Sequence, residues 1–188
     1  SLQASGWFGG ASAGPGVGYD YATQGVACCE VEVDCLSGEV AMRRADLLMD
    51  QGTPLNPEID LGQVEGGFVM ALGLFFTETI EHSPTGSNKT IGTWEYKIPA
   101  VHDIPLELNI TFLPRAPNPA PNATLHSKAC AEPPMALAVS AFLAARSAIL
   151  AARAEVEGAP RMLLLNAPLT PAAVQAACLV DPQHLVME

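Results

Sequence analysis

Apolar and polar residues alternate along residues 26–34, which is the pattern of a strand with one buried face and one solvated face. One set of alternate positions holds apolar side chains: Ala27, Cys29, Val31 and Val33. The other set is polar and mostly acidic: Cys28, Glu30, Glu32 and Asp34. Turn residues follow at 36–39, and Val40–Met49 can return as a second strand, so this region predicts a β-hairpin. The acidic set could bind a metal ion, but a solvated strand face gives the same pattern more often.

A long helix is predicted after the hairpin. Asn56 followed by Pro57 is a cap and first-turn signature, and it predicts a helix from Pro57 towards Thr77. Four glycines fall inside it: Gly62, Gly66, Gly67 and Gly73. Each costs about 1 kcal/mol relative to Ala in a helix. Their number predicts close approach by a neighbouring backbone or a ligand, with tight helix packing alone as the alternative.

A second long helix is predicted at residues 135–157, where the chain has no internal Gly or Pro. Pro133 and Pro134 suit its first turn, and Gly158 ends it. The segment is apolar almost all round, which raises the possibility of a membrane span. Arg146 interrupts it, and a central Arg costs about 2.5 to 3.5 kcal/mol on insertion. The prediction is therefore a buried core helix and no membrane.

Two further extended segments are predicted, at 93–100 and 106–113, and in the second apolar and polar residues alternate. The proline-rich residues 114–121 form a connector. A Thr-Pro pair precedes a short final helix at 172–179. Strands and helices that mix without a repeated βαβ pattern indicate an α+β fold.

The composition is that of a globular piece of protein, with 49% hydrophobic and only 15% charged residues. Its 188 residues suggest about one domain. So few charges suggest that other chain segments cover part of the surface. Twenty acidic residues against nine basic ones give a formal charge of −11, which argues against a nucleic-acid partner.

The chain has five cysteines: Cys28, Cys29, Cys35, Cys130 and Cys178. They include no C-x-x-C pair and no His at ligand spacing, so a zinc or iron–sulfur site within this chain is not expected. An odd number without a framework pattern fits reduced thiols in the cytosol. Three glycosylation motifs, beginning at Asn88, Asn109 and Asn122, point instead to a secreted protein, although so short a motif often occurs by accident. The four histidines lie in predicted loops and are expected at the surface: His82, His102, His126 and His184.

Glu132 stands at the N-terminal end of the second long helix, in the run Ser-Lys-Ala-Cys-Ala-Glu-Pro-Pro at 127–134. The helix dipole and free backbone N–H groups favour a charged carboxylate there, so Glu132 could act as a fixed base. An acidic residue just before a helix is more often a simple cap.

Three motifs together resemble one family. They are the run at 127–134, the run Asp-Leu-Gly-Gln-Val-Glu-Gly-Gly-Phe-Val at 60–69, and Gly-Thr-Trp-Glu-Tyr-Lys-Ile-Pro-Ala at 92–100. In this order they resemble the xanthine dehydrogenase and aldehyde oxidase family of molybdenum hydroxylases. The resemblance covers about residues 21–181 and implies the C-terminal part of a molybdopterin-binding domain, and so a fragment of a larger enzyme.

The resemblance implies that Glu132 is the base of an oxidative hydroxylation of N-heterocycles, such as xanthine, or of aldehydes. It implies a molybdenum–molybdopterin cofactor contacted by Gln63, Cys130 and Ala131, with 2Fe–2S clusters and FAD in other parts of the parent enzyme. It also implies a small-molecule substrate, a cytoplasmic homodimer, and an isolated segment without activity. In the family pattern a Gly is usual at Ala131 and a second Gln at Met70, and bulkier apolar residues stand at 135–136.

The predicted organisation has three parts. Residues 1–20 are a Gly-, Ala- and Ser-rich loop or interrupted segment, 21–182 the domain portion, and 183–188 a tail. A glycine-rich phosphate loop at 14–18 would need a preceding strand and a following helix, which the pattern does not predict. The alternative function is a truncated or degenerate relative that holds no cofactor and acts only as a binding or structural module.

Overall fold

The computed structural model describes residues 21–121, 123–160 and 162–180, so the expectations for 1–20 and 183–188 lie outside it. The predicted hairpin is confirmed: β1 (Gly25–Val33) pairs antiparallel with β2 (Val40–Met49). Along β1, alternate side chains from Ala27 to Val33 are half-buried, and those between them are exposed. The register shifts between Glu30 and Val31, which marks a bulge in this strand.

The predicted strand at 106–113 is also confirmed, as β3 (Glu107–Phe112). It pairs parallel with β2, which gives a three-stranded sheet in the order β1-β2-β3. A parallel connection needs a long crossover, and α1 (Pro57–Phe76) lies within it. Mixed strand directions with helices on the sheet confirm the α+β class, although the pattern alone did not predict the parallel pair.

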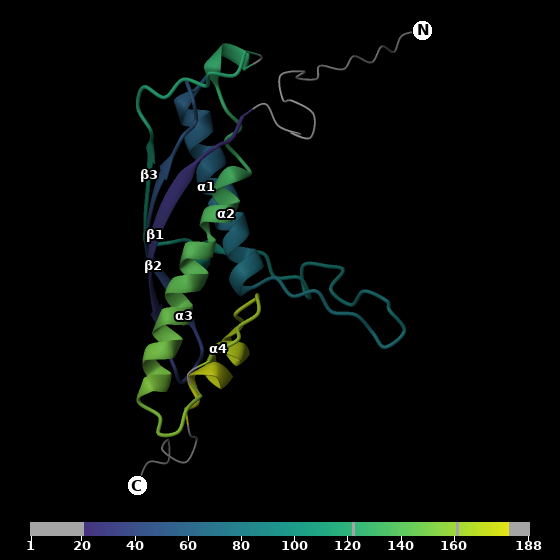
Figure 1. Cartoon of the computed structure of the whole chain (residues 1–188). Coiled ribbons are helices and arrows are strands. Elements are labelled where there is room, and N and C mark those ends of the chain that lie inside the picture. Colours follow the sequence, from purple (N-terminus) through teal and green to yellow (C-terminus); the bar gives the residue numbers. More distant parts are fainter. Residues whose placement is uncertain (1–20, 122, 161, 181–188) are drawn as a thin grey trace, which may run out of the picture.

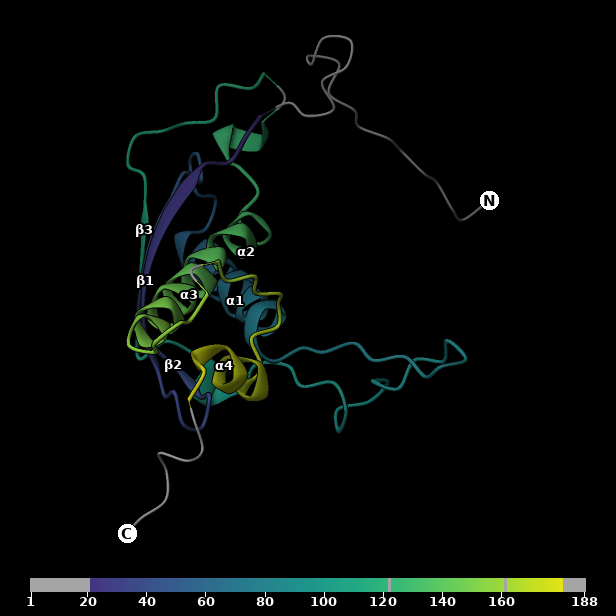
Figure 2. The same ribbon diagram turned by 60° about the horizontal axis from the view of Figure 1, so that its bottom comes forward.

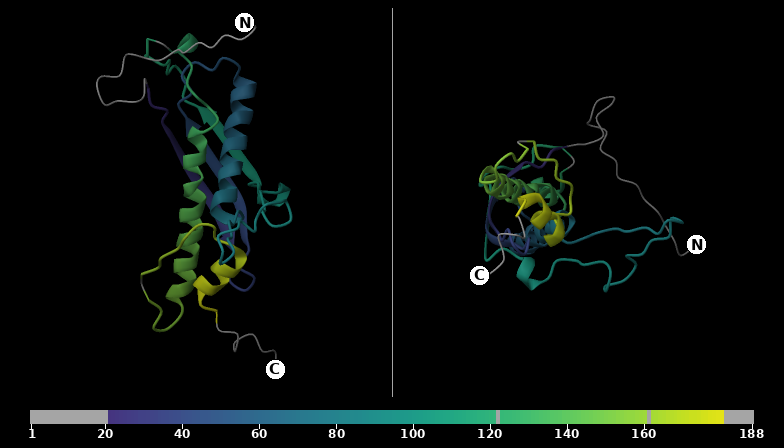
Figure 3. Two further views of the ribbon diagram at one scale, coloured as in Figure 1. Left: turned by 90° about the vertical axis from the view of Figure 1, so that its right-hand side faces the viewer. Right: turned by 90° about the horizontal axis from the view of Figure 1, so that it is seen from below.

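The helices α1, α2 (Pro133–Leu137) and α3 (Val139–Ala154) lie together on one face of the sheet (Figures 1 and 3). At the far end of α3, α4 (Pro171–Cys178) contacts that helix, and its predicted Thr170 cap accepts the N–H of Ala173 at 3.4 Å. Two 3-10 turns complete the described elements, η1 (Val101–Asp103) and η2 (Thr124–His126). The core lies between sheet and helices, and its largest fully buried apolar side chains are Phe68, Met49, Leu72, Ile149 and Leu169.

The second long helix is not continuous, contrary to the prediction of one helix over 135–157. It is interrupted at Ala138 and ends at Ala154. The N–H of Ala141 bonds to the carbonyl of Ala138, three residues back, and the Ser140 hydroxyl donates to the Leu137 carbonyl at 2.7 Å. Tight i−3 bonds and serine back-bonding both distort a helix, so they account for a break that contains no Gly or Pro.

The prediction of an extended segment at 93–100 is wrong for its first half. The N–H groups of Glu95 and Tyr96 both bond to the carbonyl of Gly92, which closes a turn. This turn belongs to a long loop over residues 78–100 that projects from the body of the protein (Figures 1 and 2). Side chains on a projecting loop have no sheet to alternate against, so their sequence pattern does not report a strand.

Large apolar side chains remain exposed on the outer faces of two helices. By length and composition alone, Pro57–Phe76 and Pro133–Ala154 are both long and apolar enough to cross a membrane. Each instead packs one face against the sheet or its neighbouring helix, as the core-helix prediction requires. The exposed apolar residues on their other faces are Ile59, Met70, Leu74, Met135, Val139 and Leu143. Exposed apolar surface of this extent is typical of a face that contacts further protein.

Candidate functional site

The segment 127–132 runs from the end of η2 to the start of α2, and neighbouring elements hold it at nearly every residue. Gly52, just after β2, forms an isolated bridge with Ser127. The N–H of Lys128 donates to the Gln51 carbonyl at 3.1 Å. Gly52 has φ +65°, and a Cβ there would collide with the carbonyl of His126, so glycine is required for this close approach. The end of β2 therefore fixes the start of the segment.

A buried ion pair lies at the same place. The Lys128 ammonium is 2.6 Å from the Asp50 carboxylate and donates to the Ala22 carbonyl at 2.8 Å. The two side chains are only 8% and 15% exposed. Burial by itself would raise the pKa of Asp50, but the hydrogen bonds from Lys128 and the Gly52 N–H outweigh it and lower the pKa below its usual value. The pair is thus charged and largely shielded from water. Each partner has one further hydrogen bond, Asp50 from the Gly52 N–H and Lys128 to the Ala22 carbonyl.

Three further contacts fix the next three residues. The N–H of Ala129 donates to the Tyr21 hydroxyl at 3.0 Å. The Cys130 thiol lies 3.7 Å from the Asp60 carboxylate of α1, and burial, followed by the nearby Asp60, raises the pKa of that thiol. A Cβ on Gly67 would overlap the Ala131 carbonyl oxygen, so the backbone of α1 and that of the segment touch at this point. Close approach by a neighbouring backbone, one of the two predicted reasons for glycine in α1, is confirmed at Gly67.

Glu132 follows directly and does not behave as a cap. It has helical backbone angles, φ −86° and ψ −34°, and its side chain makes no capping hydrogen bond. A capping residue has an extended backbone and a side chain folded back onto the N–H groups of the first turn. The Glu132 side chain is exposed. The structure therefore presents a carboxylate on a tightly held backbone, with the carboxylate itself free to meet a ligand.

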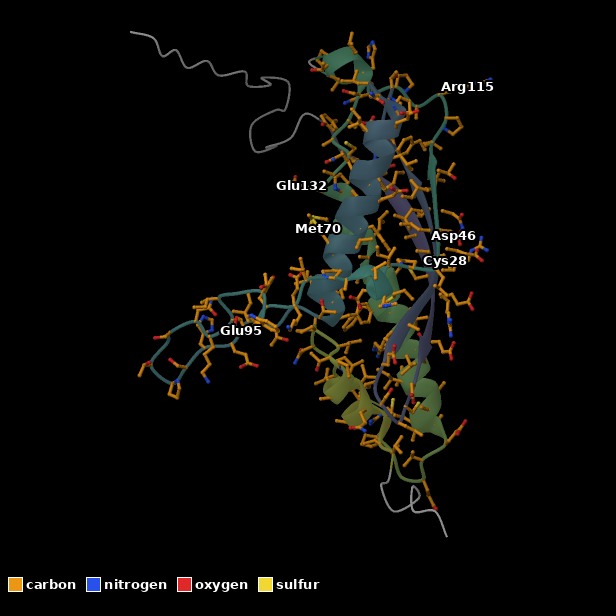
Figure 4. All side chains as sticks on the ribbon, turned by 180° about the vertical axis from the view of Figure 1, so that it is seen from behind. Cys28, Asp46, Met70, Glu95, Arg115 and Glu132 are labelled. Carbon is orange, nitrogen blue, oxygen red and sulfur yellow. The ribbon has the colours of Figure 1, made fainter. Side chains whose placement is uncertain are left out.

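The face of α1 beside this segment is open. Gln63 lies on the same side of the helix as Asp60, three residues away, and its side chain is exposed. A Cβ on Gly62 or Gly66 would meet nothing within 4 Å. Glu132 and Met70 both lie on the side of α1 that faces away from the sheet (Figure 4). The structure thus brings three features to one surface: the Gln63 amide, the uncovered helix backbone at Gly62 and Gly66, and the Glu132 carboxylate.

Of the residues expected at one site, Cys130 and Ala131 contact α1, at Asp60 and at Gly67. Gln63 lies on α1 between these two contacts, and Glu132 follows Ala131 directly. Sequence reasoning missed what positions them: Asp50, Gln51 and Tyr21, and the roles of Lys128 and Asp60. Asp50 directly follows β2, where an acidic residue looks like an ordinary turn residue. Gln51 is 1% exposed, and neither polar atom of its side chain has a hydrogen-bond partner among the described residues.

The other predicted chemistry lies elsewhere. Glu30 and Glu32 remain on the exposed outer face of β1. His82, His102 and His126 are exposed, and His184 lies outside the described residues. Within 21–121, 123–160 and 162–180, no group of three His, Cys, Asp or Glu side chains could hold a metal ion.

Comparisons with known proteins agree with the three-motif resemblance. A family model described as molybdopterin cofactor-binding domain matches residues 1–105. Xanthine dehydrogenase/oxidase of Rattus norvegicus is 44% identical over 189 residues, which cover 95% of this chain and 14% of the relative. Aldehyde oxidase 1 of Bos taurus is 44% identical over 184 residues, with the same two coverages. The chain therefore spans about one seventh of the length of these curated relatives.

The chain is also similar in fold to parts of two solved oxidoreductases. Quinoline 2-oxidoreductase from Pseudomonas putida 86 has a TM-score of 0.66 and 26% identity, over 79% of this chain and 17% of that chain. The aldehyde oxidoreductase of Desulfovibrio gigas has a TM-score of 0.63 over 83% of this chain and 15% of that chain, and at 22% identity it supports the fold alone. By its family-model match and its 44% identity to relatives over 95% of its length, the chain belongs to the xanthine dehydrogenase and aldehyde oxidase family of molybdenum hydroxylases.

Proposed function

We propose that Glu132 is the general base of an oxidative hydroxylation carried out by the larger protein to which this chain belongs. The observation that carries the proposal is the contrast between its backbone and its side chain. The backbone before it is held at Ser127, Lys128, Ala129 and Ala131, whereas the carboxylate is exposed and makes no capping bond. A residue needed only to end a helix would use its oxygens on that helix.

The residues of the open α1 face fit a molybdopterin cofactor. The bare backbone at Gly62 and Gly66 leaves room for a bulky planar group to lie against the helix, and the Gln63 amide can both donate to and accept from a pterin edge. Cys130 and Ala131 line the neighbouring segment, where the close contact with Gly67 fixes the backbone. When bound, the cofactor would supply the metal centre and the oxidising power for the reaction.

The part of this chain in the reaction is to hold and move a proton. A carboxylate oxygen of Glu132 accepts the proton that must leave as the new carbon–oxygen bond forms, and such assistance accounts for about 10² to 10⁴ in rate. Its efficiency depends on fixed geometry, which the contacts on 127–131 provide. The Gln63 amide would orient the pterin without taking part in proton transfer.

The finer features of the whole protein are part of the same proposal. The substrate would be a purine, another N-heterocycle or an aldehyde. We propose 2Fe–2S and FAD groups in the remaining domains, a homodimeric assembly and a cytoplasmic location. The names of the relatives, xanthine dehydrogenase/oxidase and aldehyde oxidase 1, support the substrate class, although this chain matches only 14% of each. The other features are proposed from membership of the family. The chain by itself is expected to bind no molybdenum and to oxidise no substrate.

The decisive experiment replaces Glu132 by Gln in the complete protein, because Gln keeps the size and hydrogen-bonding oxygen but cannot take a proton. Single-turnover reduction of the bound molybdenum by xanthine or an aldehyde should slow by about 10²-fold or more. Molybdenum content and melting temperature, measured on the same sample, should stay at the parent values. Glu155→Gln, at the exposed C-terminal end of α3, is the matched control and should leave the rate unchanged. A rate within a few-fold of the parent in fully loaded Glu132→Gln would assign the chemistry to another residue.

The cofactor contact has its own test. Gln63→Ala in the complete protein should lower molybdenum content or turnover per molybdenum while leaving any iron–sulfur and flavin absorbance intact. Asn166→Ala, which removes an exposed amide in the loop before α4, is the control. Unchanged molybdenum content and turnover in Gln63→Ala would show that this amide only faces solvent or a protein neighbour.

A further inference from the structure

The turn before the 127–132 segment is organised around one buried amide. Asn118, in the proline-rich connector, is 0% exposed. Its side-chain N–H donates to the Ser127 carbonyl at 2.9 Å, and its side-chain oxygen accepts the N–H of Ala120 at 3.1 Å. A carbonyl can only accept a hydrogen bond and a backbone N–H can only donate one, so these two partners fix the orientation of the amide.

The backbone of Asn118 also holds the residue before Ser127. Its N–H donates to the His126 carbonyl at 2.9 Å. Its carbonyl lies 3.0 Å from Nδ1 of the His126 ring, which must therefore carry the proton and donate it. The His126 carbonyl accepts a second hydrogen bond from the N–H of Thr53 at 2.8 Å. Asn118 thus bonds to two successive residues, at the place where the chain meets the end of β2.

The backbone is strained at the same place. Leu125 has φ 48° and His126 has φ 64°, and neither is glycine. Such left-handed angles persist in ordinary residues only where the surrounding contacts over-determine them. The Leu125 side chain is 73% exposed, so its own packing does not hold the turn. Asn118 supplies bonds to both residues that follow Leu125, and these bonds resist relaxation of the strained turn.

We propose that Asn118 is a positioning residue for Glu132, and that it acts by orienting the backbone that enters the 127–132 segment. This inference rests on the proposed function, because it requires Glu132 to take the proton. The Ser127 carbonyl and the Lys128 N–H belong to one peptide plane. Asn118 holds the oxygen of that plane, and the Gln51 carbonyl accepts its N–H at 3.1 Å. The plane is therefore held at both ends.

Loss of the Asn118 amide would free one end of that plane. The plane could then rotate, the left-handed turn could relax, and the start of the segment would shift relative to α1. A general base works only when its oxygen lies within hydrogen-bond reach of the proton, and a displacement of about 1 Å can cost about 10²-fold in rate. On this proposal Asn118 touches no reacting atom, so its effect must pass through Glu132.

Asn118→Ala in the complete protein removes both side-chain bonds. Asn109→Ala is the matched control, because the Asn109 amide also donates to a side-chain oxygen, that of Asp46 at 3.0 Å, but on the exposed face of the sheet. If Asn118→Ala fails to fold because of the space it leaves, Asn118→Leu removes the same bonds and fills that space with an apolar side chain.

The first measurement is hydrogen–deuterium exchange, which does not depend on activity. Peptides that cover residues 127–131 should exchange about 10-fold faster in Asn118→Ala than in the parent, because local opening becomes easier when a buried hydrogen bond is lost. Peptides from α3, and all peptides of the control, should exchange as in the parent. Parent-like exchange over 127–131 would show that Asn118 does not hold the segment and would overturn the proposal.

The second measurement is single-turnover reduction of the bound molybdenum by xanthine or an aldehyde, expressed per molybdenum. We expect Asn118→Ala to slow the rate at saturating substrate by about 10-fold or more, without changing the substrate concentration for half-saturation. Asn109→Ala should match the parent. A purely structural role would lower the molybdenum content or the melting temperature and leave the rate per molybdenum unchanged, which would also overturn the proposal.

A double variant separates this role from the proposed function. If Asn118 acts through Glu132, adding Asn118→Ala to Glu132→Gln should slow the reaction by less than about 3-fold, because the base is already absent. The full additional loss in the double variant would overturn the proposal, since Asn118 would then act on something other than Glu132. A parent-like rate in Glu132→Gln alone would refute the base and this role with it. A parent-like rate in Asn118→Ala beside a slow Glu132→Gln would refute only the role of Asn118.

Discussion

Replacing Lys128 by Met should destabilise the chain more than a surface charge change can. Met keeps most of the aliphatic length of lysine but removes the ammonium group that lies 2.6 Å from Asp50. Asp50 would then be a buried carboxylate with one remaining partner, the Gly52 N–H at 3.0 Å. Breaking a buried pair in this way costs about 3 to 5 kcal/mol. At about 2 to 4 °C per kcal/mol for a chain of this size, the melting temperature should fall by about 6 to 20 °C.

The pH dependence gives a second signature with a definite sign. In the parent, the lowered pKa of Asp50 means that its contribution to stability is complete above its unfolded pKa and is lost as the pH falls through the folded pKa. Without Lys128, only the Gly52 N–H opposes burial, which is the largest influence on the pKa of Asp50 and favours the neutral acid. Acidification should therefore stabilise the variant at this residue. The difference in melting temperature between parent and variant should therefore shrink between pH 7 and pH 4.

The assay is thermal unfolding of the purified chain, followed by circular dichroism at several pH values. Arg43→Met is the matched control, because Arg43 pairs with Glu32 on the exposed face of the sheet, where side chains are 43% and 64% exposed. That change should cost no more than about 1 kcal/mol. Adding Asp50→Asn to Lys128→Met should recover much of the loss, since no uncompensated charge remains. If Lys128→Met unfolds no earlier than Arg43→Met, the buried pair does not hold this segment.

The remaining predictions concern single positions in the chain. Gly67→Ala should destabilise the chain by about 1 to 3 kcal/mol because the new Cβ overlaps the Ala131 carbonyl, whereas Gly66→Ala should stabilise it by up to about 1 kcal/mol because its Cβ meets open space. Denaturant titration measures both free energies of unfolding, and equal changes would contradict the contact between Gly67 and Ala131. Gln51→Met should raise the free energy of unfolding by about 1 to 3 kcal/mol, since a buried amide without partners is replaced by an apolar side chain of similar size. A lower free energy of unfolding in the same titration would reveal a hidden partner of Gln51, such as a bound water. Asn109 should carry no glycan, because it lies mid-strand and its amide donates to Asp46 at 3.0 Å; the intact mass of protein from its native source, before and after glycosidase, decides this.

Local patterns predicted most of the elements because each is encoded within a few residues. The Asn56 cap, which accepts the N–H of Ile59 at 3.4 Å, and the alternation along β1 and β3 are examples. The turn at 93–96 was missed because its bonds to Gly92 are set by a loop that leaves the body. The break at Ala138 was missed because it arises from tight bonding within the helix at a residue of high helix propensity.

The candidate residues of the site could be named from sequence motifs, whereas the contacts that hold them in place could not. Glu132 and Gln63 stand in motifs that can be recognised along the sequence. The contacts between Lys128 and Asp50, and between Gly67 and Ala131, join residues that are far apart in the chain. Such pairs follow from topology, in particular from the parallel placement of β3 beside β2, which no local pattern specifies.

The parallel edge strand has a practical consequence for handling this chain. Among the described residues, β3 pairs only with β2, so the other side of β3 presents unpaired backbone groups. At the opposite edge, β1 carries a bulge and two acidic side chains, which hinder association with another strand. In contrast, β3 reads Glu-Leu-Asn-Ile-Thr-Phe, with one charge, no proline and no irregular pairing. Concentrated preparations of the chain alone should therefore self-associate through β3, and a lysine at the outward-facing Thr111 is the simplest change to improve its solubility.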